Sequence, residues 1–166
     1  MKTVILIRHA KSSHEHAGMS DVERPLNGRG EREAPRMARR LAERGGAFDL
    51  LISSPANRAR STAGIFAEML GASPSDSRID DRLYSGMTSD ILCVVHDLGP
   101  AMDRVLLFGH NPNVTEFVNA FQNVEILNVP TCGVVELSFN VESWSEVRPG
   151  EAVRMRFNYP KEDERA

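Results

Sequence analysis

The chain contains 166 residues, of which 41% are hydrophobic and 26% are charged, and its formal net charge is −3. A chain of this length and composition is typical of one globular domain with a full hydrophobic core. The slightly negative charge gives no reason to expect nonspecific binding to nucleic acid or anionic membranes, so any basic binding site must be local.

Strands and helices are expected to alternate along the chain. In chain order, the pattern predicts a strand at 4–7, a helix at 34–42, a strand at 48–52, a helix at 55–70, a short strand or extended loop at 78–83, a helix at 91–98, a strand at 105–108, a helix at 112–121, and strands at 134–139 and 153–157. This order predicts a three-layer α/β/α sandwich around a mostly parallel sheet, with an antiparallel pair at one edge. No linker interrupts the chain, so we expect a single domain at 1–160 and a charged tail at 161–166.

Three positions make these predictions more specific. Pro35 fits its helix only within the first turn or at a kink, because proline cannot donate a helical hydrogen bond. Ser54 is predicted to be the N-cap of the second helix, and Pro55 its first residue. A Pro149-Gly150 turn is expected between the last two strands.

The sequence contains no pattern typical of secretion, membrane insertion or metal binding. Cys93 and Cys132 are the only cysteines, and they form neither a disulfide framework nor a zinc-binding spacing. His14-Glu15-His16 has no clear third metal ligand. The apolar N-terminal run is too short for a signal peptide. We therefore expect a cytoplasmic protein with no cofactor, no nucleic-acid partner and no membrane partner.

Polar side chains follow three of the predicted strands at the point where each strand ends. Arg8 and His9 follow the first strand, Ser54 and Arg58 follow the second, and His110 follows the strand at 105–108. Taken singly, each junction has an ordinary explanation as a strand end, a helix cap or a solvated side chain. Ligands of an open α/β sheet bind outside the carboxyl ends of its strands, so the three junctions together predict one site.

These residue types suit the transfer of a phosphoryl group. Arg8 and Arg58 offer forked, permanently charged donors that match phosphoryl oxygens, and helix N-termini add free N–H groups. A neutral imidazole such as that of His9 is a good nucleophile near neutral pH, and the second imidazole, that of His110, can bind the charge that develops on oxygen. The set predicts a phosphohistidine intermediate.

The segments "LIRHAKSS", "SSPANRARSTA" and "GHNP" resemble the signatures of the histidine phosphatase superfamily, which has the phosphoglycerate mutase-like fold. The short chain and the segment "SDVERPLNGRG" resemble the SixA-type phosphohistidine phosphatases more closely. The resemblance implies that His9 is the nucleophile, that Arg8 and Arg58 bind the phosphoryl group and that His110 stabilises the transition state. Residues Lys11, Ser12 and Arg24 lie in the same predicted loop and are candidate substrate-binding residues, with solvation or pinning of the loop as the alternative.

Two departures from the common superfamily pattern bear on the substrate. Ala10 replaces the glycine of Arg-His-Gly, as in many SixA-type sequences. The segment "DDRLYSG" resembles the region where larger members carry a glutamate proton donor, but it contains no glutamate. Imidazole is an easier leaving group than an alkoxide, because its conjugate acid has a pKa of about 6.5, so it needs a dedicated acid less.

We therefore predict a metal-independent phosphatase that hydrolyses phosphohistidine on a protein. A small-molecule phosphomonoester phosphatase of the same fold is the alternative, and an inactive phosphate-binding module is a weaker one. Should a proton donor exist, Glu15, Asp21 and Asp81 are the first candidates.

Overall fold

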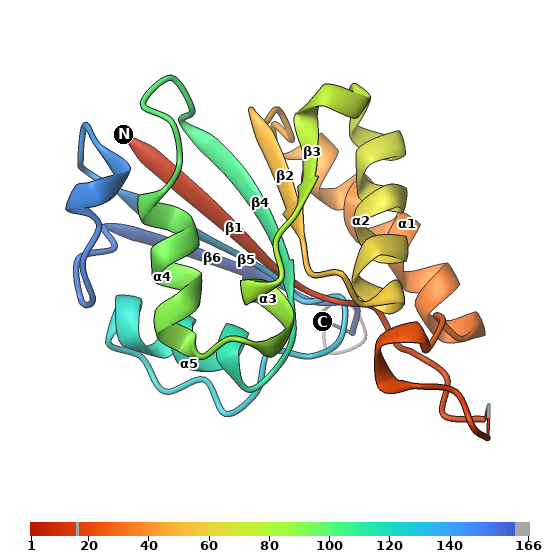
Figure 1. Cartoon of the computed structure of the whole chain (residues 1–166). Coiled ribbons are helices and arrows are strands. Elements are labelled where there is room, and N and C mark those ends of the chain that lie inside the picture. Colours follow the sequence, from red (N-terminus) through yellow and green to blue (C-terminus); the bar gives the residue numbers. More distant parts are fainter. Residues whose placement is uncertain (16, 162–166) are drawn as a thin grey trace.

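The computed structural model describes residues 1–15 and 17–161, which form three layers around one sheet (Figure 1). The strands are β1 (Lys2–Arg8), β2 (Leu50–Ser53), β3 (Ser77–Ile79), β4 (Arg104–Gly109), β5 (Val134–Phe139) and β6 (Arg154–Asn158). The helices are α1 (Gly28–Glu43), α2 (Asn57–Leu70), α3 (Arg82–Ser85), α4 (Thr88–His96) and α5 (Asn113–Gln122). Short 3₁₀ turns form at η1 (Asp21–Glu23), η2 (Pro74–Asp76) and η3 (Trp144–Glu146).

The six strands lie in the order β3-β2-β4-β1-β5-β6. Strands β1 to β4 run parallel, whereas β5 pairs antiparallel with both β1 and β6. This arrangement confirms the predicted α/β fold, with a mostly parallel sheet and an antiparallel edge. Because Arg8 of β1 lies opposite Gly109 of β4, the carboxyl ends of these central strands are level with each other.

Alternating side chains of the central strands fill two cores on opposite faces of the sheet. In β1, Val4 and Leu6 pack with the helices α4 and α5, whereas Ile5 and Ile7 pack with α1 and α2. Figure 1 shows these two helix pairs on opposite sides of the strands. Burial of β1 on both faces explains its continuous apolar sequence, which is typical of a central parallel strand.

Helix α1 begins several residues earlier than the sequence predicts. The side chain of Asn27 caps the helix by accepting a hydrogen bond of 3.0 Å from the N–H of Gly30. Pro35 consequently lies in the interior of α1, which rules out the first-turn alternative, whereas the kink at Pro35 stays a prediction. A glycine is required at position 30, because a Cβ atom there would lie 2.2 Å from the carbonyl oxygen of Lys11. This close approach fixes the helix against the loop that follows β1.

Two further predictions change in detail. Helix α2 begins at Asn57 with Ala56 as its N-cap, so the prediction of Ser54 as the cap and Pro55 as the first helical residue is wrong. The segment at 78–83 splits, since β3 ends at Ile79 and α3 follows it. The turn at residues 149–150 is confirmed, but it lies within a longer connection that also contains η3.

No helix among residues 1–15 and 17–161 has the length and hydrophobicity needed to cross a lipid bilayer. The domain boundary at residue 160 stays a prediction, and residues 162–166 of the predicted tail lie outside the described residues.

Candidate active site

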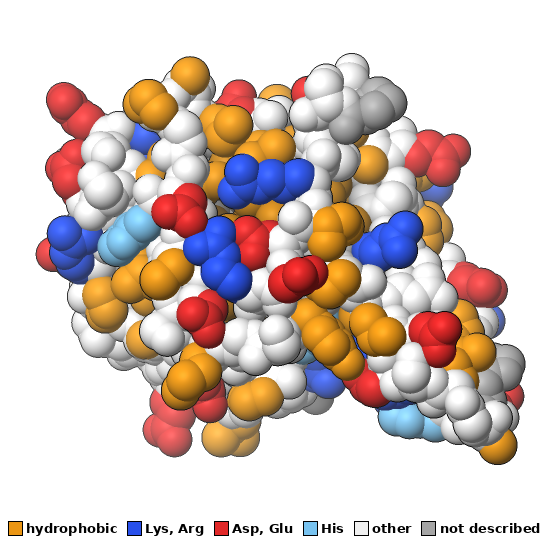
Figure 2. Space-filling model, in the orientation of Figure 1, with side chains coloured by type: hydrophobic (Ala, Val, Ile, Leu, Met, Phe, Trp, Pro, Cys, Tyr) orange, Lys and Arg blue, Asp and Glu red, His pale blue; other side chains and the backbone are white. Residues whose placement is uncertain are grey.

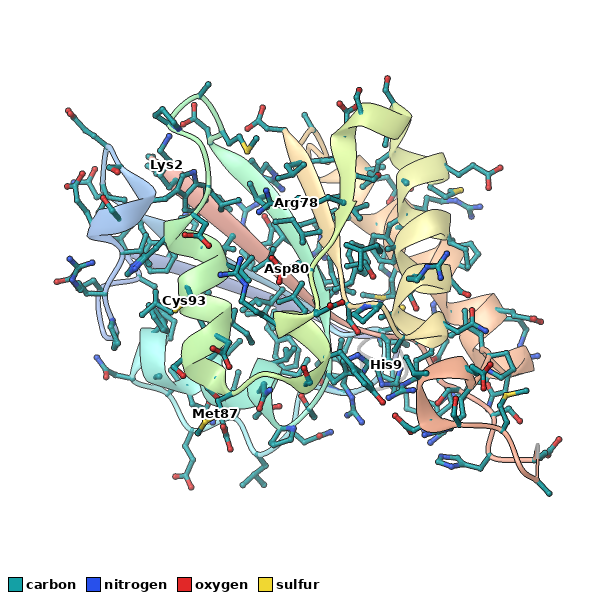
Figure 3. All side chains as sticks on the ribbon, viewed as in Figure 1. Lys2, His9, Arg78, Asp80, Met87 and Cys93 are labelled. Carbon is teal, nitrogen blue, oxygen red and sulfur yellow. The ribbon has the colours of Figure 1, made fainter. Side chains whose placement is uncertain are left out.

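A polar hollow of about 200 Å³ opens at the carboxyl ends of the central strands. It is lined by Arg8, His9, Lys11, Ser12, His14, Arg24, Arg58, His110, Asn111 and Thr131. Figure 3 shows His9 at this edge of the sheet, below the strands. The structure therefore brings together all seven residues that the sequence singled out.

The ring of His9 is buried and has a defined orientation. Its Nδ1 lies 2.7 Å from the carbonyl oxygen of Ala10, and since a carbonyl can only accept, Nδ1 must carry the proton. The other ring nitrogen, Nε2, keeps its lone pair and lies 3.4 Å from Nε of Arg58, which donates to it. The Ala10 N–H in turn donates to the hydroxyl of Thr62 on α2, which holds this turn of the backbone in place.

Burial lowers the pKa of His9 to about 3, and the nearby positive charges add to this effect. The hydrogen bond to Ala10 acts in the opposite direction but is the smaller cause. The imidazole is therefore neutral at pH 7, which is the state that a nucleophile requires.

His110 lies beside His9, with a distance of 4.9 Å between the ring centroids. Its Nε2 lies 2.8 Å from the hydroxyl oxygen of Ser54, whereas its Nδ1 is buried and has no partner among the described residues. Burial, followed by the charge of Arg58, lowers the pKa of His110 to about 4. This ring is also neutral at pH 7, so only one of its two nitrogens, Nδ1 or Nε2, is protonated.

Arg58 is held in place by η1. Its two terminal nitrogens donate to the backbone oxygen of Asp21 at 2.6 Å and to the Asp21 carboxylate at 2.9 Å. The same carboxylate accepts hydrogen bonds from Arg24 at 2.8 Å and from the hydroxyl of Tyr84 at 2.9 Å. Arg24, then Arg58 and Tyr84, hold the pKa of Asp21 well below its usual range. Asp21 is therefore an ionised carboxylate at neutral pH.

Arg8 reaches across to the segment that precedes β5. Its guanidinium donates to the carbonyl of Val129 at 2.9 Å and to the side chain of Asn128 at 3.2 Å, and its buried Nε has no partner among the described residues. The amide of Asn111 donates to the same two oxygens, at 3.1 and 2.8 Å. Burial lowers the pKa of Arg8, but a guanidinium remains charged.

The three candidate substrate-binding residues differ in what they contact. Arg24 donates to the carbonyl of Ser13, to the hydroxyl of Ser12 and to His14, in addition to Asp21. Arg24 and Ser12 therefore hold the loop together, which agrees with the alternative that these residues stabilise the loop rather than bind substrate. The amine of Lys11 makes no hydrogen bond or ion pair with a described residue, which leaves it available to a ligand in the hollow.

A profile of the histidine phosphatase superfamily (branch 1) matches residues 4–84. An uncharacterized protein of Picosynechococcus is 30% identical over 135 residues, which cover 78% of this chain and 81% of that protein. The chain belongs to the histidine phosphatase superfamily.

Solved structures extend the comparison to the whole fold. A SixA protein of Agrobacterium tumefaciens, named as a candidate phosphohistidine phosphatase, has a TM-score of 0.78 and 27% identity and covers 96% of this chain and 98% of its own. A mycobacterial glucosyl-3-phosphoglycerate phosphatase has a TM-score of 0.67 and 15% identity, with 95% and 97% covered, which shows the fold alone. The predicted resemblance to SixA is confirmed, and the comparisons support a phosphatase of the histidine phosphatase superfamily.

Several residues around the histidine phosphatase site were not predicted. Ser54 was interpreted as a helix cap, although its partner is His110. Asp21 and Tyr84 form the support of Arg58, and no local pattern indicates a contact between η1 and α2. Asn111 does carry a signal, because it lies within "GHNP" directly after the predicted histidine.

Proposed function

We propose that this protein hydrolyses phosphohistidine on another protein through a phosphohistidine intermediate on His9. The orientation of His9 carries the proposal. Its Nδ1–H is bound to the Ala10 carbonyl, so the free lone pair of Nε2 faces the basic hollow, beside Arg58. A neutral, oriented imidazole surrounded by cationic donors is equipped to attack phosphorus.

In the first step, Nε2 of His9 forms a bond to phosphorus while the bond from phosphorus to the substrate imidazole breaks. The second ring nitrogen of the substrate imidazole carries a proton, so the leaving group departs as neutral imidazole. Arg8, Arg58 and His110 bind the three equatorial oxygens, and the Arg58 hydrogen bond passes from His9 to one of them. Lys11 adds a further positive charge. In the second step, water attacks the phosphorus atom while the bond from phosphorus to Nε2 breaks; both hydrogens of the water leave on dihydrogen phosphate, and Nε2 regains its lone pair.

The role of His110 depends on which nitrogen holds its proton. Nε2 is taken by Ser54, so Nδ1 is the nitrogen left for a phosphoryl oxygen. The Ser54 oxygen accepts from the Ala56 N–H at 3.2 Å, and its own proton has no acceptor other than His110 among the described residues. Ser54 therefore donates to Nε2, the proton of the neutral ring lies on Nδ1, and Nδ1–H donates to the phosphoryl group.

The absence of a suitable acid supports phosphohistidine as the substrate. Asp21 is ionised by its arginine and tyrosine partners and cannot donate a proton at neutral pH. Neither Glu15 nor Asp81 lines the hollow. A site of this kind expels imidazole far more easily than an alkoxide, because the alkoxide is much the stronger base.

A leaving-group series tests the proposal against a phosphomonoester phosphatase of the same fold. We expect kcat/KM to be high for phosphohistidine and aryl phosphates and to fall steeply toward alkyl phosphates such as sugar phosphates. A flat dependence would mean that a proton donor operates, and it would favour the phosphomonoester alternative. Rapid quenching with labelled substrate should place an acid-labile, alkali-stable label on His9. The same label should be missing from His9→Ala.

Independence from metal is part of the proposal. Within residues 1–15 and 17–161, no group of three or more His, Cys, Asp or Glu side chains is arranged to hold a metal ion. Chelators should therefore leave the rate unchanged. Vanadate, which adopts the five-coordinate geometry of the transition state, should inhibit competitively.

A further inference from the structure

Helix α1 presents an unpaired basic surface next to the active site. Arg32 and Arg36 are exposed, and neither makes a hydrogen bond or ion pair with any described residue. With the exposed Lys161, and with Arg29 and Glu33, they line a hollow of about 520 Å³. Arg29 and Glu33 pair with each other at 2.8 Å, whereas Arg32, Arg36 and Lys161 have no ion-pair partner among residues 1–15 and 17–161. Arg32, Arg36 and Lys161 are named here the α1 basic surface.

Two contacts place this surface beside the site. Gly30, at the start of α1, packs against the backbone of Lys11, whose side chain lines the active-site hollow. Farther along the helix, Arg36 is close enough to Cys132 to act on the pKa of its thiol, which burial raises. The N–H of Cys132 lies 3.0 Å from the carbonyl of Arg8 and 3.1 Å from that of His9. The basic surface thus flanks the backbone that carries the nucleophile.

The charges of the α1 basic surface do not stabilise helix α1. Arg32 and Arg36 are four residues apart, and like charges at this spacing destabilise a helix. By contrast, the face shown in Figure 2 interleaves acidic and basic side chains. Arg82, for example, pairs with both Asp80 and Asp97.

A small phosphorylated molecule that fills the active-site hollow of about 200 Å³ leaves the α1 basic surface uncovered. A protein that displays its phosphohistidine in the hollow can also contact α1, because this helix adjoins the loop of Lys11 that lines the hollow. We propose that the α1 basic surface docks an acidic patch on the phosphorylated protein substrate, next to its phosphohistidine. This inference rests on the proposed function and defines its substrate more narrowly.

The test uses three probes with the full-length protein. Two are phosphohistidine peptides of one design, flanked by glutamates in one and by lysines in the other, and the third is p-nitrophenyl phosphate. The test variant is Arg32→Glu/Arg36→Glu. The matched control is Arg78→Glu/Arg154→Glu, which changes the net charge equally on the strands β3 and β6; Figure 3 shows Arg78 well away from His9.

We expect the natural protein to prefer the acidic peptide by about 10-fold in kcat/KM at low salt, in the range of electrostatic steering. This preference should decline as the salt approaches 0.5 M, because exposed charges are screened. The test variant should lose the preference and keep its rate on p-nitrophenyl phosphate within about 2-fold. The control variant should keep both.

Three results would overturn the inference. These are an equal rate of the natural protein on both peptides, an equal loss of preference in the control variant, and a test variant whose peptide preference is unchanged. If neither peptide is hydrolysed while the aryl phosphate is, the proposed phosphohistidine specificity fails first. The two failures are therefore distinguishable.

Discussion

Replacing Ser54 with alanine removes the one oxygen atom that binds Nε2 of His110. Ser54 is fully buried, and its hydroxyl lies 2.8 Å from this nitrogen. Without it, the neutral ring can place its proton on Nε2 and turn a lone pair of Nδ1 toward the phosphoryl oxygens. Removing one donor from an oxyanion site costs about 10²–10³-fold in kcat. We therefore expect Ser54→Ala to lower kcat by about 10²-fold with little change in KM.

The same substitution should lower the free energy of unfolding by about 1–3 kcal/mol, since it leaves the buried Ala56 N–H and His110 Nε2 without their partner. Stability loss alone would not lower kcat of the folded fraction. Ser54→Thr retains the hydroxyl and should recover most of kcat, although its extra methyl group is expected to cost some stability in a fully buried position.

Nitrogen-15 NMR of the imidazoles provides the decisive measurement, because the two neutral tautomers differ in their nitrogen chemical shifts. The natural protein should show His110 protonated at Nδ1, and Ser54→Ala should show a shift toward the Nε2 form. A natural protein with the proton on Nε2, or an unchanged kcat in Ser54→Ala, would refute this account of His110.

Three further outcomes follow from the site and its support. The pKa of His9 is about 3 and that of His110 about 4, against about 6.5 when unfolded, so the unfolded chain binds more protons between these values. The free energy of unfolding should be highest above pH 6.5. Below pH 6.5 it should decrease by up to about 1.4 kcal/mol per pH unit for each histidine. The same pH dependence in the variant His9→Asn/His110→Asn would contradict this. Gly30→Ala should lower the melting temperature, because its Cβ would overlap the Lys11 carbonyl, whereas Gly64→Ala, where a Cβ meets nothing within 4 Å, should not. Arg58→Ala should reduce kcat by several powers of ten while the fold is retained, as judged by circular dichroism.

The positions of the nucleophile and its arginines could be predicted because they depend on local patterns. An apolar run that ends at Arg8 and His9 specifies a buried strand with polar groups at its carboxyl end, and β4 with His110 repeats the pattern. Parallel pairing then brings these ends together, so the site follows from the sheet.

The support of the site could not be predicted, because it depends on contacts between residues that are distant in sequence. Ser54 is a residue type that favours helix N-caps, but its hydroxyl forms a hydrogen bond with His110, which lies 56 residues away in the sequence. The ion pair of Asp21 with Arg58 spans 37 residues, and it forms only because η1 folds back over α2. Propensity and periodicity carry no information about such pairings.

The segment "DDRLYSG", which lacks the glutamate, contributes Tyr84 to the surroundings of the site. This residue lies with its ring 5.5 Å from that of His110, and its hydroxyl donates to Asp21. The segment thus supplies a donor that keeps Asp21 ionised, rather than an acid that would protonate a leaving group. Imidazole that is protonated on its second nitrogen leaves as a neutral group, whereas an alkoxide leaves as a strongly basic anion. The sequence departure and the ionised state of Asp21 therefore both support the substrate that we propose, a phosphoryl group bound to nitrogen.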